Sequence, residues 1–186
     1  MFEMQAYQLE SKLDMNIELG PLSRNSNVSL FLLKPELVTQ DYVSWLNDPE
    51  VNQYLESRFT KHTLESSRNF VQCLLDSPAN LFLGIRSNLL GRHVGNIRIG
   101  PIDKYHRMGE IGIMIGDKEA WCQGNASSAV LLMVEIARDL LLLRKVFAGY
   151  YASNIASQQL FEKCGFKLEA IRKQHFLFNE RLEDEV

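Results

Sequence analysis

A short apolar run, a loop of small residues and a long apolar helix follow one another between Glu110 and Leu143. The run Ile111–Ile115 is typical of a buried strand, and Gly116–Ala120 forms a polar link after it. Apolar residues then recur every three or four positions, which predicts a helix over residues 126–143. The order strand, small-residue loop, helix restricts both the fold and the kind of ligand that this part of the chain can bind.

The loop Trp121–Ser128 lies where such a helix begins, and this position favours an anion. The first turn of a helix has backbone N–H groups without partners, and they add to the positive end of the helix dipole. Gly124 and Ala126 leave room for a phosphate to approach the backbone, and Ser127 and Ser128 can add hydroxyl donors. The loop lacks the Gly-Lys-Ser/Thr of a Walker A motif and the three glycines of a dinucleotide fingerprint. We therefore expect a diphosphate at Gln123, Gly124, Asn125, Ala126, Ser127 and Ser128.

Composition limits the classes of protein that remain. A chain of 186 residues, 46% of them hydrophobic, suits one domain with a sizeable core. A net charge of −3 gives no electrostatic basis for nucleic-acid binding, and no apolar run is long enough to cross a membrane. Three widely spaced cysteines argue against disulfides and a zinc site and suit a reducing cytoplasm. We expect no metal, no nucleic acid and no membrane partner, and a monomer or homodimer.

The rest of the chain predicts one mixed domain over residues 25–186, preceded by an appendage over residues 1–24. Connections that are mostly short favour an antiparallel meander, and the long helix supplies one parallel crossover. The expected fold is therefore α/β (α+β), with a mixed, mostly antiparallel sheet flanked by helices. Strands are predicted at residues 28–33, 81–86, 93–100, 110–115, 145–152, 166–172 and 176–185, the last as a hairpin around Asn179-Glu180. Helices are predicted at residues 40–46, 49–54, 64–75, 126–143 and 154–163, with a loop at residues 58–62.

A second motif, Asn154-Ile-Ala-Ser157-Gln-Gln-Leu-Phe161-Glu-Lys-Cys-Gly165-Phe166, follows the first at a set distance. Together with Trp121-x-x-Gly124-x-Ala126, it resembles the acyl-CoA site of the GNAT acetyltransferases, whose loop reads Arg/Gln-x-x-Gly-x-Gly/Ala. The segment Trp45–Val51 resembles the opening of the branch that acetylates ribosomal proteins and amino sugars. The resemblance covers roughly residues 28–186.

The resemblance implies transfer of acetyl from acetyl-CoA to a primary amine, by direct attack in a ternary complex. It implies that the backbone of Ile113, Met114 and Ile115 binds the thioester arm. It also implies that Asn154 contacts pantetheine and that Ser157 can hydrogen-bond the leaving sulfur. Phe161 stands where many members of the family have a proton-donating tyrosine, so it can contact the cofactor but has no proton to give.

An attacking amine must lose a proton, because a lysine-like amine has a pKa of about 10.4 and an α-amine one near about 8. Two residues can take that proton, Glu110 where the central strand begins and His175 where the last hairpin begins. A water chain to backbone carbonyls is the alternative to both.

The acceptor site should lie opposite the cofactor, with Tyr54, Arg58 and Arg107 as candidate ligands. Either arginine could bind a nucleotide diphosphate bidentately. The segment Tyr54–Phe59 resembles members associated with amino-sugar nucleotides, and no acidic cluster suited to a basic peptide lies near it. A small-molecule amine such as an amino-sugar nucleotide is therefore favoured. The alternatives are the N-terminus of a ribosomal protein or other peptide, and a non-catalytic CoA sensor.

Overall fold

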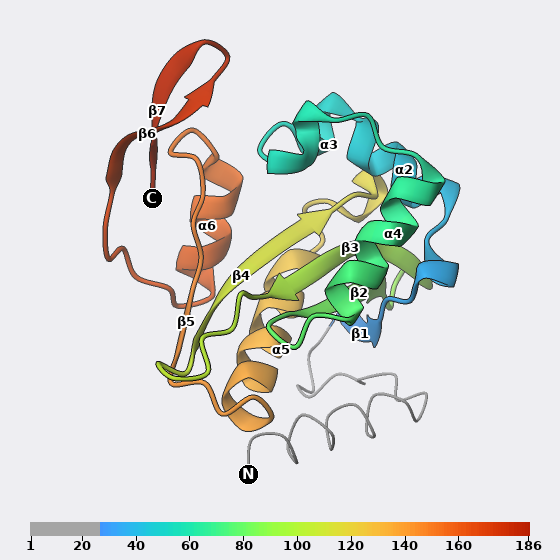
Figure 1. Cartoon of the computed structure of the whole chain (residues 1–186), viewed down its shortest axis with the longest axis horizontal. Coiled ribbons are helices and arrows are strands. Elements are labelled where there is room, and N and C mark those ends of the chain that lie inside the picture. Colours follow the sequence, from blue (N-terminus) through green and yellow to red (C-terminus); the bar gives the residue numbers. More distant parts are fainter. Residues whose placement is uncertain (1–26) are drawn as a thin grey trace.

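The computed structural model describes residues 27–186, and the predicted appendage at residues 1–24 lies outside them. Five strands form the central sheet in the order β1-β2-β3-β4-β5 (Figure 1). The first three neighbouring pairs are antiparallel, and β4 pairs with β5 in parallel. The predicted mixed, mostly antiparallel sheet is confirmed. Its strands are β1 (Val28–Leu32), β2 (Leu81–Ser87), β3 (Arg92–Ile99), β4 (Met108–Ile115) and β5 (Lys145–Phe147).

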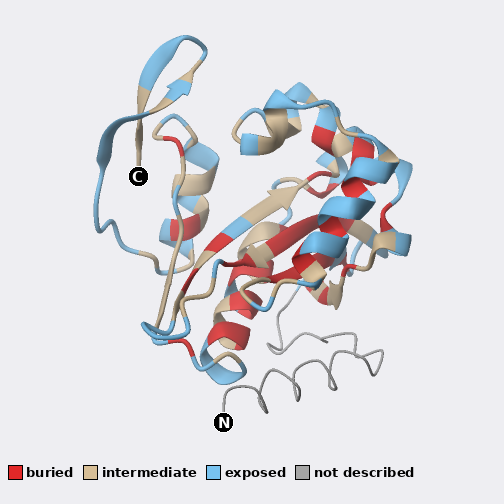
Figure 2. Cartoon of the chain, in the orientation of Figure 1, coloured by how far each residue is buried: buried red, intermediate tan, exposed pale blue. Residues whose placement is uncertain are grey.

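Helices cover both faces of this sheet, with α4 in front and α5 behind in the view of Figure 1. Buried residues gather where β2 and β3 pass between these two helices (Figure 2). Ile97, Ile111 and Met133 belong to the core on the α5 face, and Tyr42 and Phe82 belong to the core on the α2–α4 face. None of the described helices has the length and apolar character needed to span a membrane. The helices are η1 (Pro35–Leu37), α2 (Gln40–Asn47), α3 (Pro49–Asn52), η2 (Glu56–Phe59), α4 (Leu64–Leu75), η3 (Lys118–Ala120), α5 (Asn125–Asp139) and α6 (Ile155–Lys163).

The strands β4 and β5 pair over only three positions, ending at Glu110 opposite Phe147. Beyond this point they separate and form a fork, and none of the described strands pairs with the rest of β4 on that edge. The predicted strand 145–152 therefore stops at Phe147. Its continuation pairs instead with the end of the chain, where the Tyr150 N–H donates to the Val186 carbonyl at 3.0 Å.

The chain ends in the predicted hairpin, formed by β6 (Arg172–Phe178) and β7 (Arg181–Glu185). Asn179 and Glu180 both have positive φ, 49° and 63°, as a two-residue type I′ turn requires. The predicted strand at residues 166–172 is wrong, because residues 166–171 have no neighbouring strand and Leu168 is 67% exposed.

Two helix boundaries also differ from the sequence pattern. The helix predicted to reach Leu143 ends at Asp139, and Leu142 adopts a left-handed conformation with φ 53°. The apolar periodicity continues through this segment, although the helix does not. The predicted loop at residues 58–62 begins inside the short helix η2.

His93 gives the fold a predictable dependence on pH. Its ring is packed against Phe31, Tyr42 and Trp45, and burial lowers the pKa of the imidazole below its usual value of 6.5. The unfolded chain therefore binds more protons than the folded chain just below that value, so stability is lost as pH falls through about 6.5. We expect chemical denaturation to show that the free energy of unfolding falls less between about pH 6.5 and 5 for His93→Gln than for the natural protein. Equal losses would exclude His93 as the cause.

Candidate active site

Helix α5 begins at a glycine that leaves the first backbone amides open. Gly124 is the N-cap residue, with a left-handed φ of 79°, and no side chain of residues 27–186 caps the helix. The first turn also contains no acidic residue. The N–H groups of residues 125–127 have no acceptor within the helix. The start of α5 therefore has backbone amides that an anion could accept from, and the diphosphate site expected here stays a prediction.

Several side chains around this turn form hydrogen bonds to main-chain carbonyls of the loop. The buried Asn125 donates through Nδ2 to the Ala120 carbonyl at 2.9 Å, and the Ser127 hydroxyl donates to the Gly124 carbonyl at 3.0 Å. Gln123 donates through Nε2 to the Glu119 carbonyl at 2.5 Å. A ligand here would therefore be held mainly by the main chain, with the Ser128 hydroxyl available in addition.

The main chain of β4 supplies a second set of open groups. The Gly100 N–H donates to the Glu110 carbonyl at 2.8 Å, which makes these two residues a hydrogen-bonded pair of the antiparallel ladder. By the alternation of such ladders, the backbone of Met114 faces β3, whereas that of Ile113 points into the fork. The Ile115 carbonyl accepts the indole N–H of Trp121 at 2.8 Å. Of the three residues predicted to bind the thioester arm, Ile113 is the best placed, whereas the Met114 backbone is directed to β3.

Helix α6 presents the residues of the second motif on the other side of the fork. Asn154 is its N-cap, and its Oδ1 accepts the Ser157 N–H at 3.1 Å. The Asn154 amide nitrogen and the Ser157 hydroxyl have no partner among residues 27–186, so both can bind a ligand. Phe161 is only 5% exposed and stacks on Tyr150, and both line a 340 Å³ cavity under the helix. Its role in packing is therefore clear. Burial raises the pKa of the Cys164 thiol, which makes it a poor nucleophile.

Both predicted bases lie near the base of the fork, linked by a residue that the sequence did not indicate. Both Glu110 and Glu185 approach Gly149. A Cβ added to Gly149 would lie 3.5 Å from Oε1 of Glu110 and 2.6 Å from Oε1 of Glu185. The other Glu185 oxygen lies 3.2 Å from His175 Nε2 and 2.8 Å from Arg172 Nη1. Glu110 has no hydrogen bond or ion pair with a described side chain. It is therefore the uncommitted carboxylate of this cluster.

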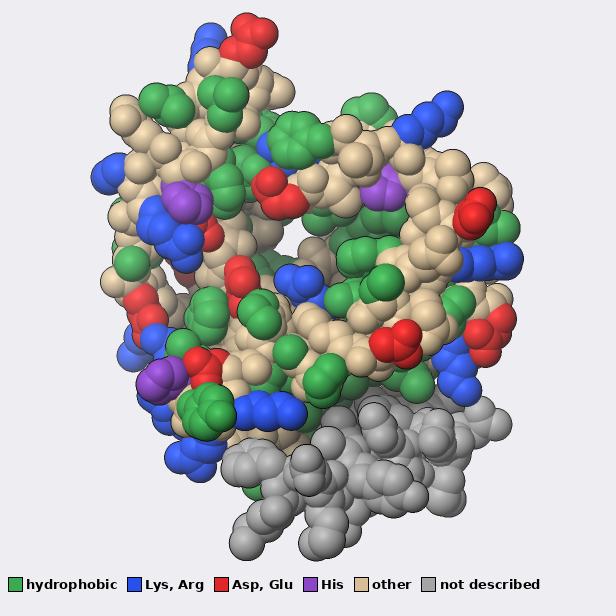
Figure 3. All heavy atoms as spheres, viewed as in Figure 1, with side chains coloured by type: hydrophobic (Ala, Val, Ile, Leu, Met, Phe, Trp, Pro, Cys, Tyr) green, Lys and Arg blue, Asp and Glu red, His purple; other side chains and the backbone are tan. Residues whose placement is uncertain are grey.

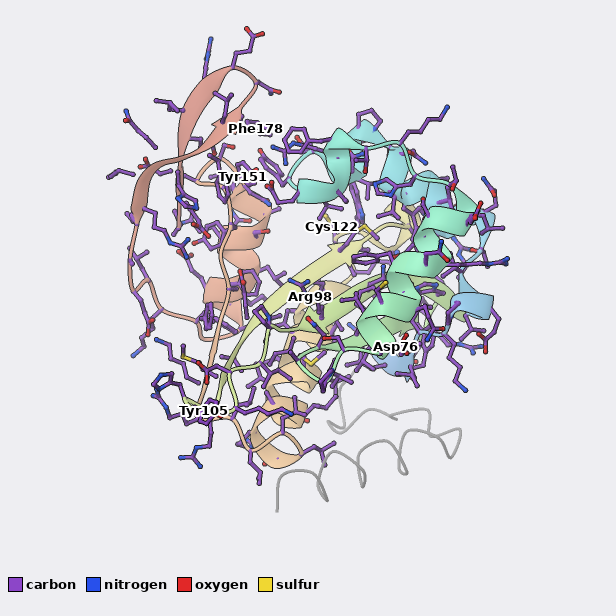
Figure 4. All side chains as sticks on the ribbon, in the orientation of Figure 1. Asp76, Arg98, Tyr105, Cys122, Tyr151 and Phe178 are labelled. Carbon is purple, nitrogen blue, oxygen red and sulfur yellow. The ribbon has the colours of Figure 1, made fainter. Side chains whose placement is uncertain are left out.

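A bridge of polar and aromatic side chains joins the segment around η2 to the C-terminal hairpin; we call it the Tyr151 bridge. Arg58 is 13% exposed and donates to the Tyr151 hydroxyl at 2.9 Å, and that hydroxyl donates to Glu56. Tyr54 donates to the Ser153 carbonyl at 3.2 Å and stacks on the ring of Phe178. Burial and the nearby Glu56 carboxylate raise the pKa of Tyr151, so its hydroxyl remains a donor. Tyr151 and Phe178 lie between the two halves of the molecule in Figure 4.

The structure separates the three predicted acceptor ligands. Tyr54 and Arg58 belong to the Tyr151 bridge, but Arg107 comes just before the first residue of β4, at the far end of the strand. Tyr105, two residues before Arg107, lies well apart from the bridge residue Tyr151 in Figure 4. The structure therefore does not bring Arg107 together with the other two predicted ligands.

The fork is an actual opening and is not filled by side chains. Figure 3 shows a passage through the molecule between β4 and the side formed by α6 and the hairpin. A groove of 710 Å³ lies nearby, between the segment around η2 and the tip of the hairpin, and Arg58 and Phe178 are among the residues that line it. No group of three or more His, Cys, Asp or Glu residues within 27–186 could hold a metal ion.

Comparison with known proteins agrees with this geometry. The family described as "Acetyltransferase (GNAT) domain" matches residues 30–167, which is most of the chain. The chain therefore belongs to the GNAT acetyltransferase family, and it is an N-acetyltransferase. A search among curated proteins found no match.

Solved structures share the fold at low sequence identity. The spermidine N-acetyltransferase from Vibrio cholerae, solved with CoA and spermine, has a TM-score of 0.76 at 20% identity, covering 87% of this chain and 93% of that one. The microcin C7 self-immunity acetyltransferase MccE, solved with acetyl-CoA and AMP, has a TM-score of 0.76 at 16% identity, covering 89% and 95%. A probable acetyltransferase has a TM-score of 0.75 at 20% identity, covering 87% and 91%. These similarities show that the chain shares the fold of these acetyltransferases.

Proposed function

We propose that this enzyme acetylates the primary amine of a small molecule, by direct attack on acetyl-CoA within a ternary complex. The diphosphate of acetyl-CoA would sit on the first amides of α5, with its thioester beside Ile113 in the fork. Ser157 and Asn154 are available to the sulfur and to the pantetheine arm. Glu110 is the proposed base, because it is the carboxylate at the fork without a partner in the described part of the chain.

The Tyr151 bridge is the observation that favours a small acceptor. It closes the acceptor side of the fork by joining η2 to the segment after β5, through Arg58, Tyr151 and Tyr54. An extended peptide needs an open groove across the fork, whereas a small molecule can enter through the passage that remains. The two solved relatives bound to spermine and to AMP are consistent with small ligands in this fold.

The amino-sugar nucleotide becomes a weaker candidate on this geometry. Its diphosphate was expected on Arg58 or Arg107, but Arg58 is engaged by the bridge and Arg107 lies at the far end of β4. Relationship to the branch that acetylates ribosomal proteins and amino sugars remains part of the proposal, supported by the segment Trp45–Val51. We therefore favour a small amine without a nucleotide.

Two measurements test this proposal in sequence. Isothermal titration measures acetyl-CoA binding, and a thiol-release assay then compares small amines, amino-sugar nucleotides and peptides with free N-termini. We expect binding and turnover on small amines, with no turnover on peptides. Turnover restricted to peptides would contradict the proposal. Binding without turnover on any amine would instead favour the CoA sensor.

A further inference from the structure

A charged side chain without a partner lies in the middle of the sheet, close to the fork. Arg98, on β3, is half-buried, and it makes no hydrogen bond or ion pair with any residue from 27 to 186. A guanidinium that gives up part of its hydration without gaining an anion is unfavourable, so partly buried arginines are usually paired. Figure 4 shows Arg98 beside the central part of β4. The position suggests that its partner is a ligand.

Strand register places Arg98 on the α2–α4 face of the sheet. Ile97 and Ile99 belong to the core on the α5 face, so the residue between them points to the opposite face. The cross-strand partner of Arg98 is Gly112, and by the same alternation Glu110 is on that face too. Arg98 and the proposed base therefore lie on one face, on adjacent strands.

Gly112 makes the surface between these two charges accessible. It is exposed, and a Cβ added there would meet nothing within 4 Å. A ligand can therefore lie against the backbone of Gly112, next to a cationic side chain on β3 and an anionic side chain two residues earlier on β4. Such a niche matches a molecule that carries an amine and a carboxylate a few bonds apart.

We propose that Arg98 binds a carboxylate of the acceptor, and that the enzyme acetylates an amino acid or a similar amine bearing a carboxylate. This inference rests on the proposed function and narrows its substrate class. The planar guanidinium can donate two parallel hydrogen bonds to a carboxylate and so fix the position of the acceptor. The amine would then lie at Glu110, which takes its proton. The amine nitrogen forms a bond to the thioester carbon, the carbon–sulfur bond breaks, and CoA leaves as the thiolate.

Matched acceptors and matched variants test the role of Arg98. Steady-state kinetics would compare amino acids with their methyl esters, which keep the amine and lose the negative charge. For the natural protein we expect lower KM values for the acids. For Arg98→Gln we expect the KM for the acid to rise about 10- to 100-fold and the KM for the ester to change by less than about 2-fold. Arg98→Lys should recover part of the loss, and Arg68→Gln, which removes an exposed charge on α4, should behave like the natural protein.

The outcomes separate this inference from the proposed function. Equal KM values for acid and ester, or an equal change in both on Arg98→Gln, would overturn the inference while leaving the enzyme a small-amine acetyltransferase. If no amine were acetylated although the protein still bound acetyl-CoA, the proposed function would be overturned instead. Thermal unfolding of each variant would show whether a change in KM reflects loss of structure.

Discussion

Replacing Gly124 with glutamate is expected to weaken acetyl-CoA binding by at least about 100-fold. The proposed diphosphate site consists of backbone amides at the start of α5, which none of the described side chains caps. A carboxylate placed there would compete for these amides and repel the phosphates. Two charge-assisted hydrogen bonds lost at about 1.5–3 kcal/mol each account for a change of this size. Isothermal titration with acetyl-CoA measures it directly.

Backbone strain must be separated from this effect. Gly124 has a φ of 79°, and a side chain in the left-handed region costs roughly 1–2 kcal/mol of stability. Gly91→Glu is a matched control, because Gly91 has a φ of 68° and space around it but lies in the β2–β3 turn, away from a helix N-terminus. Both variants should unfold at similar temperatures, and only Gly124→Glu should lose binding. Unchanged affinity in a folded Gly124→Glu variant would show that the phosphates bind elsewhere.

Replacing Glu110 with glutamine is expected to lower kcat by about 100- to 10,000-fold, the usual contribution of a general base. Glutamine keeps the shape of the side chain but cannot accept the proton of the attacking amine. Affinity for acetyl-CoA should not change, since the proposed cofactor contacts lie at α5, the Ile113 backbone and α6. Single-turnover kinetics with saturating acceptor, together with titration of acetyl-CoA, would distinguish these two effects.

A control variant and a variant of the alternative base, His175, complete this test. Glu65→Gln removes an exposed carboxylate on α4 and should leave kcat unchanged. Full activity of Glu110→Gln, combined with loss in His175→Ala and an altered pH–rate profile, would assign the base to His175. Full activity of both variants would point to a water chain to backbone carbonyls.

Local chain geometry explains why part of the site can be predicted from the sequence. Gly124 adopts the left-handed conformation that opens α5, and Asn154 caps α6, and both roles depend on a few neighbouring residues. The hairpin around Asn179 is local for the same reason. The central sheet also follows from short connections and one long crossover, so its mixed topology could be inferred without the structure.

Other parts of the site depend on contacts between segments distant in the sequence, and the spacing of apolar residues does not predict such contacts. Arg98 lies opposite Gly112, on the face away from α5, because of the β3–β4 register, which could not be inferred from the sequence. Glu185 reaches Gly149 because the end of the chain pairs with the continuation of β5. An arginine such as Arg58 is a suitable phosphate ligand by its chemistry. Its hydrogen bond to Tyr151, however, joins residues 93 positions apart, which the sequence does not predict.

A crystal structure of the enzyme with acetyl-CoA tests the central claim most directly. We expect diphosphate oxygens within about 2.7–3.2 Å of the amides at the start of α5, and the thioester beside Ile113 in the fork between β4 and β5. A cofactor bound with its diphosphate away from α5, or with the fork empty, would contradict this account.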